Sequence, residues 1–374
     1  MSKLFQPITL GGVTLSNRVL IAPMCQYSAK EGMIQPWHWQ HLGVLSISGA
    51  GAVIVEATGV EAAGRISPGD TGLWNDEQEA AFKKLIADIH SYSDTPVGIQ
   101  LAHAGRKAST NVPWVEKGGP LSAEQGAWTT SAPSAIPFTE GWHTPVSLDT
   151  AGMTRIKTAF IEAAQRADRA GFAIVELHGA HGYLFSEFLS PISNQRTDQY
   201  GGSLENRMRF PLEVAEAVRA VWPKDKALGM RLNGSDWVEG GVTPEETAEM
   251  AKRLKALGFD YAHISSGGNV ATAKIPGREP GYQLDFAEVV KTANPDFTVI
   301  AVGMIAGAHQ AETVLTEGKA DMIALARAVL DDPRWPHHAA ETLDGAKQTE
   351  SPWPLQYQRA AGAAWPGRTL RDFG

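Results

Sequence analysis

The segment from 173 to 184, Ala173-Ile-Val-Glu-Leu-His178-Gly-Ala-His181-Gly-Tyr183-Leu184, joins an apolar run to a group of polar side chains. Its first half is aliphatic or β-branched and predicts a buried strand. Its second half is interrupted by glycines and contains two imidazoles and a phenol. Three side chains that exchange protons, placed where a strand ends, are suited to binding a polar oxygen and delivering a proton.

Two other interpretations of His178 and His181 have to be weighed. A histidine in a strand is often structural, and two histidines three positions apart can form half of a metal site. A metal site needs further ligands, but Glu176 is the only candidate nearby, and the sequence has neither an HExxH motif nor a cluster of Cys and His. We therefore favour a polar-group site without a metal over both alternatives.

Apolar runs of strand length recur along the whole chain, and helical patterns separate them. The helical patterns after Asn75, Asp149 and Thr243 each begin with a capping residue, and Thr243-Pro-Glu-Glu246 has the form of a capping box. The expected strands are 18–24, 52–58, 97–104, 173–178, 227–232, 261–265, 298–303 and 322–326.

This alternation of strands and helices predicts an α/β fold, the closed (β/α)8 TIM barrel. The structural alternative is a doubly wound open sheet, which usually binds its nucleotide through a GxGxxG motif after the first strand. The sequence contains neither that motif nor a Walker A loop. We therefore expect the barrel.

Three segments lie outside the regular alternation. Residues 5–17 have alternating residues around Gly11-Gly12 and predict an N-terminal hairpin. Residues 105–148, between the third and fourth strands, are rich in Pro, Gly and Trp and predict a long capping segment, which is either a functional lid or a connection with small elements of its own. Residues 348–374 form a C-terminal tail. Without a long Pro/Gly/Ser linker, we expect a single domain over 1–374.

Composition excludes several classes of protein. The 374 residues have a net charge of −8 and no block of Lys and Arg, so neither nucleic acid nor a membrane is an expected partner. One cysteine, Cys25, rules out an internal disulfide and an iron–sulfur cluster held by several thiolates of this chain. The start of the chain lacks the apolar run of a signal peptide, and together these features predict a cytoplasmic protein.

Polar or glycine residues stand at several of the strand ends where such barrels place their active sites. Arg231 is the sharpest case, because a buried guanidinium needs an anion, either a carboxylate such as Glu176 or a charge on a ligand. Gly303 and Arg327 follow the seventh and eighth strands, where such barrels often hold a phosphate. Other candidates at strand ends are Pro23 to Tyr27, Glu56 to Thr58, Gln100 and His103.

Four stretches make the chain resemble the old yellow enzyme family of FMN-dependent ene-reductases, in particular its shorter bacterial subgroup with the xenobiotic reductases. The resemblance covers nearly the whole chain, and the last two stretches are long and specific. They are Pro23-Met-Cys-Gln-Tyr27, Ile99-Gln-Leu-Ala-His-Ala-Gly-Arg106, His178-Gly-Ala-His-Gly-Tyr-Leu184 and Asn194-Gln-Arg-Thr-Asp-Gln-Tyr-Gly-Gly-Ser-Leu-Glu-Asn-Arg207.

The resemblance implies a role for each matching position. His178 and His181 would bind the activating oxygen of the substrate, Tyr183 would donate the proton, and Tyr27 would line the pocket. The flavin ring would contact Ala22, Pro23, Met24, Cys25, Ala57, Gln100 and Arg231. The phosphate would be held by Gly303, Met304, Ala326 and Arg327.

The resemblance also implies a reaction and partners. Tightly bound FMN would take a hydride from NADPH or NADH and reduce the C=C bond of an α,β-unsaturated carbonyl or a related nitro compound. Gln356-Tyr-Gln-Arg359 matches a C-terminal segment of the subgroup that reaches a neighbouring subunit. A homodimer or a larger homo-oligomer, with Arg359 contributed in trans to the substrate pocket, is therefore expected.

Three competing functions stay open at this point. An iron–sulfur 2,4-dienoyl-CoA reductase shares this barrel, but the single cysteine counts against it. A metal-dependent lyase or aldolase would use the two histidines as ligands. A flavin-binding protein without catalysis would have no need for Tyr183 beside paired imidazoles.

Overall fold

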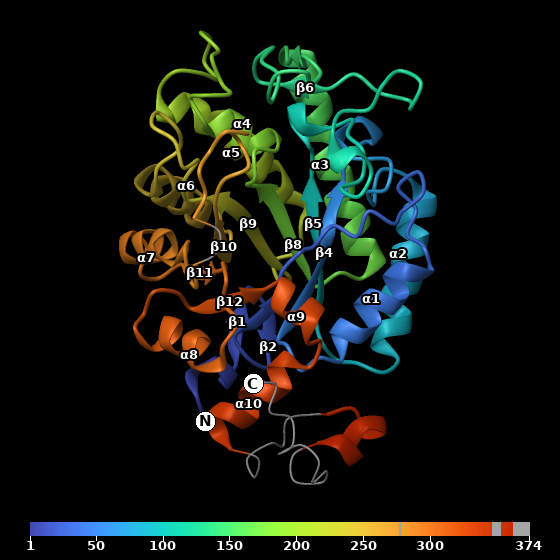
Figure 1. Ribbon diagram of the computed structural model, residues 1–374, viewed down its shortest axis with the longest axis vertical. Coiled ribbons are helices and arrows are strands. Elements are labelled where there is room, and N and C mark those ends of the chain that lie inside the picture. The colour runs from blue at the N-terminus through green and yellow to red at the C-terminus, as the bar shows by residue number, and fades with distance from the viewer. Residues whose placement is uncertain (277–278, 346–352, 362–374) are drawn as a thin grey trace.

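The computed structural model describes residues 1–276, 279–345 and 353–361, and within them eight parallel strands close into a barrel surrounded by helices (Figure 1). The order around the barrel is β3-β4-β5-β8-β9-β10-β11-β12. The predicted TIM barrel is confirmed, and the open sheet is excluded. The barrel strands are β3 (Val19–Ile21), β4 (Ala52–Gly59), β5 (Val97–Ala102), β8 (Ile174–Gly179), β9 (Ala227–Asn233), β10 (Tyr261–Ser265), β11 (Thr298–Ala301) and β12 (Met322–Leu325).

The helices begin where the sequence provides caps. Asn75 accepts a hydrogen bond from the backbone of Gln78, and Asp149 accepts one from Gly152. The helices are α1 (Pro36–Ser46), α2 (Asp76–His90), α3 (Thr150–Ala170), α4 (Leu184–Leu189), α5 (Leu204–Val221), α6 (Pro244–Ala256), α7 (Leu284–Ala293), α8 (Ala308–Thr316), α9 (Arg327–Asp331) and α10 (Trp335–Asp344), with short 3-10 turns η1 (Lys3–Phe5), η2 (Ala62–Gly64), η3 (Gly105–Lys107), η4 (Glu116–Gly118) and η5 (Leu355–Ala360).

The predicted capping box at the start of α6 forms only in part. Thr243 accepts a hydrogen bond from the backbone N–H of Glu246, as expected. The carboxylate of Glu246 does not reach back, because it forms an ion pair at 2.5 Å with the buried guanidinium of Arg207 on α5. The long-range charge pair replaces the local hydrogen bond and ties α5 to α6.

The predicted N-terminal hairpin closes the lower end of the barrel. Strands β1 (Ile8–Leu10) and β2 (Val13–Leu15) pair antiparallel, and Gly11 at the turn has a φ of 56°. Leu10 and Leu15 pack against inward-facing side chains at the lower ends of the strands, such as Ile174 and Tyr261. Because the lower end is sealed by apolar side chains, polar chemistry is confined to the opposite end.

The segment 105–148 lies at the upper end, beyond the carboxyl ends of the barrel strands (Figure 1). It contains η3, η4 and the short parallel pair β6 (Ser131–Ala132) and β7 (Val146–Ser147). The indole of Trp128 donates a hydrogen bond to the backbone of Ala63, which anchors the segment to the loop after β4. The segment therefore lies at the end of the barrel that carries the polar residues of β8.

The C-terminal part lies at the other end of the molecule. Figure 1 shows η5, in red, below the barrel together with α10. The guanidinium of Arg334 stacks over the ring of Tyr357 at 4.5 Å, and His337 stacks on Trp353. Of the expected tail 348–374, only 353–361 belong to the described residues. Across the described ranges, no helix is long and apolar enough to cross a membrane.

Candidate active site

The structure brings His178, His181 and Tyr183 together at the carboxyl end of β8. The rings of His178 and His181 meet edge to face with centroids 5.1 Å apart, and those of His178 and Tyr183 do so at 4.9 Å. His181 has a φ of 61°, a left-handed conformation that is uncommon for a residue with a side chain. This turn allows two histidines three positions apart to face the same space.

Backbone hydrogen bonds fix how the two imidazoles are presented. The N–H of Ala180 donates to Nδ1 of His178 at 3.2 Å, so Nδ1 is the acceptor and Nε2 carries the proton. The N–H of His181 donates to the side chain of Asn233 on β9 at 3.0 Å. Nε2 of His181 lies 2.7 Å from the hydroxyl of Ser265 on β10. Each imidazole therefore has one nitrogen engaged and one available to a ligand.

Both imidazoles are neutral at neutral pH. Burial, followed by the positive charges of Arg231 and Lys107, holds the pKa of His178 well below its ordinary value. Burial and the charge of Arg231 do the same for His181. Burial raises the pKa of Tyr183 well above its ordinary value, so the phenol keeps its proton. The cluster thus presents neutral N–H groups that can donate hydrogen bonds to a ligand oxygen and a neutral O–H group that can donate a proton to a ligand carbon.

Arg231 is buried in β9, with 7% of its surface exposed, and it is not paired with Glu176. Within the described ranges its guanidinium donates one long side-chain hydrogen bond of 3.5 Å to Ser265, and its Nε has no partner there. Burial lowers the pKa of Arg231 and the charge of Glu176 opposes that effect, so the two groups interact, but they form no salt bridge, and the alternative of a charge on a ligand stays open. A buried guanidinium with an unsatisfied N–H is matched to the anionic edge of a ligand.

Glu176 instead belongs to a buried polar layer beneath Arg231. Its carboxylate accepts a hydrogen bond from the amide of Gln100 at 2.7 Å and lies 3.0 Å from Nδ1 of His263. Burial alone would raise the pKa of Glu176, but His263, Arg231 and Gln100 together lower it. This layer holds the side chain of Gln100 in place on the inner wall of the barrel.

Strand β10 contributes two site residues that were not expected from the sequence. His263 and Ser265 alternate with apolar residues in this strand, so both point inward and both contact site residues. The signal was present, because a polar side chain in an otherwise apolar strand costs stability unless it has a partner. The same reasoning that singled out Arg231 applies to His263.

Residues after β3 form one wall of the site. The backbone of Ala22 still pairs with β12, and Pro23, Met24 and Cys25 follow. The N–H of Gln26 donates to Glu56 on β4 at 2.8 Å, which fixes the course of this loop. Burial and the carboxylates of Asp70 and Glu56 raise the pKa of the Cys25 thiol, so it stays protonated.

Tyr27 links this wall to the capping segment. It has a φ of 50°, and its ring meets that of Trp114 edge to face at 5.9 Å. Burial raises its pKa, and nearby Cys25 adds to the effect. Trp114 is 68% exposed, so this contact is a bridge between the barrel and the rim of its mouth.

Ala57 and Gln100 stand side by side on adjacent strands. The register of β4 against β5 shifts between Val55 and Ala57, which is the signature of a β-bulge at Glu56. Bulges commonly occur beside active sites, where they redirect a side chain. Here the bulge pairs Ala57 with Gln100 and lets Glu56 bind both Gln26 and His38.

The loops after β11 and β12 form a separate corner. Gly303 has a φ of 129°, and a Cβ there would approach the side chain of Gln283 to 2.7 Å. Met304 has a φ of 50°, and the Arg327 guanidinium contacts its sulfur at 3.7 Å. Ala326 precedes Arg327 at the start of α9. Arg327 is exposed and forms no ion pair with a described residue, so it is available to a phosphate.

Two candidates do not join the cluster. His103 lies 3.2 Å from Glu61, which is also bound by Arg155, and this pairing is structural. Arg359 is exposed on η5, at the opposite end of the molecule from the carboxyl end of β8 (Figure 1). The described part of the chain contains no group of three or more His, Cys, Asp or Glu side chains able to hold a metal.

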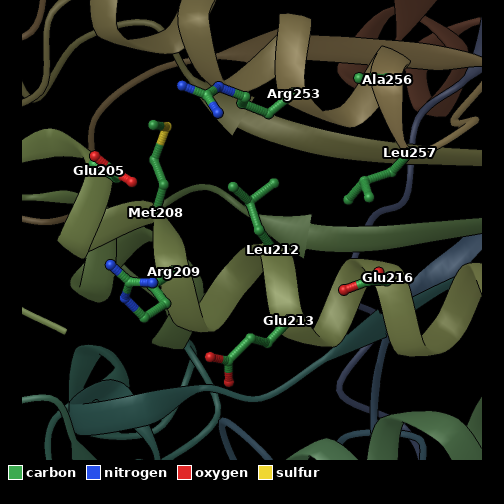
Figure 2. Close-up of a pocket in the computed structure, with 9 residues that line it drawn as sticks. All are labelled: Glu205, Met208, Arg209, Leu212, Glu213, Glu216, Arg253, Ala256 and Leu257. Atoms are coloured by element: carbon green, nitrogen blue, oxygen red, sulfur yellow. The ribbon is translucent and has the colours of Figure 1, made fainter. Parts of the chain in front are cut away.

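A groove of about 370 Å³ lies elsewhere, on the outer surface between α5 and α6 (Figure 2). Met208, Leu212 and Leu257 form its floor, and Glu205, Glu213, Glu216, Arg209 and Arg253 surround them. None of the candidate site residues lines this groove. It is separate from the mouth of the barrel.

The arrangement at the mouth fits a phosphorylated cofactor with an anionic edge. Arg231 has a buried Nε without a hydrogen-bond partner in the described ranges that could face such an edge, and the backbone at Gly303 together with Arg327 could hold a phosphate. FMN has both features, since its reduced ring carries negative charge near the pyrimidine edge. The fold and site therefore define a barrel oxidoreductase that uses a flavin.

Comparison with known proteins gives the family. Residues 3–345 match the model of the NADH:flavin oxidoreductase / NADH oxidase family, and the chain belongs to this family, which includes the old yellow enzymes. An NADPH dehydrogenase of Geobacillus sp. (strain WCH70) is 42% identical over 94% of this chain and 98% of that protein. The protein is thus an FMN-dependent oxidoreductase that takes its hydride from NADPH or NADH.

Solved structures agree with this assignment. Morphinone reductase superposes with a TM-score of 0.74 and 30% identity, covering 90% of this chain and 89% of that one. The old yellow enzyme homologue of Zymomonas mobilis superposes with a TM-score of 0.75 and 26% identity, covering 91% and 93%. The expected family resemblance is confirmed over nearly the full described chain.

Proposed function

We propose that the protein is an ene-reductase of the xenobiotic reductase type, which reduces the C=C bond of α,β-unsaturated carbonyls and related nitro compounds with NADPH as the preferred donor. The observation that supports this most strongly is the cluster of two neutral imidazoles and one protonated phenol on a single strand end. Among the residues that the structure describes, Arg231 forms no salt bridge, and this supports a flavin beside it.

FMN supplies a hydride from its reduced ring once NADPH or NADH has reduced it. The residues proposed to hold the ring are those that line the mouth, with Arg231 at its anionic edge and Cys25 on the wall after β3. Gln100, fixed by Glu176, presents its remaining amide groups to the ring. The full set for the ring is Ala22, Pro23, Met24, Cys25, Ala57, Gln100 and Arg231, and for the phosphate Gly303, Met304, Ala326 and Arg327.

His178 and His181 bind the oxygen of the substrate. Their free N–H groups donate hydrogen bonds, and these bonds strengthen as negative charge develops on that oxygen. A neutral imidazole is suited to this role, because its proton stays on the nitrogen when the oxygen becomes anionic. Each such donor is typically worth roughly 10²–10³ in rate.

Tyr183 delivers the proton to the α-carbon. Its phenol is buried beside His178, so an oxygen held by the imidazoles leaves the adjacent carbons within range of the hydroxyl. A high pKa suits donation to a strongly basic, carbanion-like carbon. Tyr27 lines the pocket, and its contact with Trp114 makes the capping segment 105–148 part of the substrate-binding surface.

We further propose that the protein acts in the cytoplasm as a homodimer in which Arg359 enters the pocket of the neighbouring subunit. Two observations support the trans arrangement. Arg359 and Leu355 are exposed on η5, and η5 lies far from the β8 strand end of its own chain (Figure 1). The test uses mixed dimers of one Tyr183→Phe chain and one Arg359→Ala chain, each inactive alone. If Arg359 acts in trans, the site of the Arg359→Ala chain keeps Tyr183 and receives Arg359 from the other chain, so activity returns.

An anaerobic stopped-flow experiment tests the function. NADPH should bleach the flavin absorbance, and 2-cyclohexenone, a nitroalkene or both should restore it. Reoxidation only by oxygen, with no response to any member of a panel of enones, nitroalkenes and nitrate esters, would contradict the proposal. Comparing NADPH with NADH in the first step measures donor preference.

A further inference from the structure

Lys107 is held beside Tyr183 by contacts that the proposed reaction does not use. Its ammonium group donates hydrogen bonds to the backbone oxygens of His181 and Gly268, both at 2.8 Å. It also lies 4.9 Å from the ring centroid of Tyr183 and 4.8 Å from that of Phe138. Two of its three N–H groups are therefore fixed, and the charge lies over the ring of Tyr183.

This cation has no carboxylate partner at ion-pair distance among the described residues. Burial lowers the pKa of Lys107 to about 8, and the charge of Glu187 opposes that effect. The side chain is thus still mostly protonated at neutral pH. A cation without a paired anion in a poorly solvated place costs stability, and this cost favours a functional role for Lys107.

The position of Lys107 depends on a close approach of two loops that only glycine allows at Gly182 and Gly268. A Cβ on Gly182 would approach the Gly268 oxygen to 2.3 Å, and a Cβ on Gly268 would approach the His181 oxygen to 2.5 Å. Both glycines have positive φ. The two loops therefore meet closely enough for one ammonium group to bind both carbonyls, which holds it over the Tyr183 ring.

The proposed reaction creates a charge at this point. When Tyr183 protonates the α-carbon, its O–H bond breaks, a C–H bond forms with the electron pair of the enolate, and the O–H electron pair stays on the phenolate oxygen. A proton from solvent later restores the phenol. A phenolate in buried surroundings is costly unless a cation lies near it.

We propose that Lys107 is a positioning residue whose charge stabilises the phenolate form of Tyr183 during protonation of the substrate carbon. This inference rests on the proposed role of Tyr183. An opposite charge within ~4–6 Å of an acid favours its ionised form by about 1–3 pKa units, so loss of the cation should slow proton donation about tenfold or more.

A double-mutant cycle tests the inference on the FMN-loaded protein. Lys107→Met should leave flavin reduction by NADPH unchanged, slow flavin reoxidation by cyclohexenone about tenfold, and increase the solvent isotope effect on that step. Lys107→Arg, which keeps the charge, should retain most of the rate. In a Tyr183→Phe background, Lys107→Met should have no further effect, because the phenol through which it acts is gone.

Two readouts separate a charge effect from a structural one. Lys107→Gln keeps an N–H donor without the charge and should behave like Lys107→Met, which covers the case in which the Met variant folds poorly. Reoxidation by a quinone, which needs protons only on oxygen, should be unaffected in every Lys107 variant. The exposed Lys83→Met is the matched control and should resemble wild type throughout.

The results distinguish a failure of the proposed role of Tyr183 from a failure of the proposed role of Lys107. If Tyr183→Phe reoxidises normally with cyclohexenone, the proposed function of Tyr183 fails. If Tyr183→Phe is slow but Lys107→Met and Lys107→Gln are not, only the role of Lys107 is overturned. Two further results would show that Lys107 only holds His181 in place, and each would overturn the proposal. One is that Lys107→Met slows flavin reoxidation by the same factor in wild type and in Tyr183→Phe. The other is that Lys107→Met weakens phenol binding and slows reoxidation by quinone as much as reoxidation by cyclohexenone.

Discussion

The rings of His178 and Tyr183 lie edge to face, with planes at 84° and centroids 4.9 Å apart. His178 is the last but one residue of β8, and Tyr183, five positions later, is the N-cap of α4, so a short turn places a hydrogen-bond donor and a proton donor around one space. An oxygen bound by the imidazole is therefore held next to the phenol. Oxygen binding by the imidazole and proton donation by the phenol can be tested separately.

Tyr183→Phe should separate the two halves of catalysis. The variant should bind FMN and be reduced by NADPH at the wild-type rate, because the phenol takes no part in hydride transfer to the flavin. Reoxidation by cyclohexenone should fall by about 10²-fold or more, within the range expected for loss of a general acid. Stopped-flow absorbance measures both steps, and a quinone oxidant is the internal control.

His178→Ala combined with His181→Ala should remove the oxygen-binding donors. Loss of two such donors should lower the rate of enone reduction by more than about 10²-fold and weaken binding of a phenol, followed by the change in flavin absorbance. FMN content should remain. Normal turnover of cyclohexenone by this variant would show that the imidazoles do not bind the oxygen.

Glu187 makes stability depend on pH in a defined direction. It is fully buried on α4, one oxygen accepts the N–H of Arg106, and burial raises its pKa from 4.5 to about 8. The folded state therefore holds the proton more tightly than the unfolded state. The contribution of Glu187 to the free energy of unfolding is fully present below pH 4.5 and is lost progressively between pH 4.5 and 8. At 1.36 kcal/mol per pKa unit, the loss amounts to up to about 5 kcal/mol.

Glu187→Gln, which resembles the neutral acid, should escape this loss. Its melting temperature relative to wild type should increase from pH 5 to pH 8, measured by thermal unfolding of the FMN-loaded proteins. The exposed substitution Glu216→Gln is the control, and its difference from wild type should stay flat. An increase of equal size in both variants, or none in Glu187→Gln, would contradict the buried protonated state.

Gly229 tests the packing inside the barrel. It lies opposite Tyr261 on the next strand, and a Cβ there would come within 2.2 Å of the Tyr261 ring. Gly229→Ala should destabilise the protein by about 1–3 kcal/mol or more, because the buried ring has to move. In Gly307→Ala, where the nearest atom is 3.9 Å away, the change should stay below about 1 kcal/mol. Denaturant unfolding measures both.

Much of the fold could be predicted from the sequence because its signals are local. Apolar runs of strand length, helix caps at Asn75 and Asp149, and the glycine turn of the hairpin each depend on a few neighbouring residues. The cluster in 173–184 was also local, since its three polar residues come from one strand end. The expected strand bounds differ from the observed ones by a few residues, as at β3, which spans Val19–Ile21 where 18–24 was expected.

The remaining features depend on partners far along the chain. Glu246 pairs with Arg207 instead of its own backbone, and Glu176 contacts His263 and Gln100 directly instead of forming a salt bridge with Arg231. Neither choice can be read from spacing, because several carboxylates and cations were equally near in sequence. Lys107 gave no signal at all, since its partners are backbone oxygens brought together by left-handed turns.

The most direct measurement of the central claim is single-turnover oxidation of the NADPH-reduced protein by 2-cyclohexenone without oxygen, comparing wild type with Tyr183→Phe. The account predicts rapid recovery of the flavin spectrum in wild type, formation of cyclohexanone, and slow recovery in the variant after equally fast reduction. The account would be contradicted if the protein bound no flavin, or if the enone reoxidised wild type and Tyr183→Phe at the same rate.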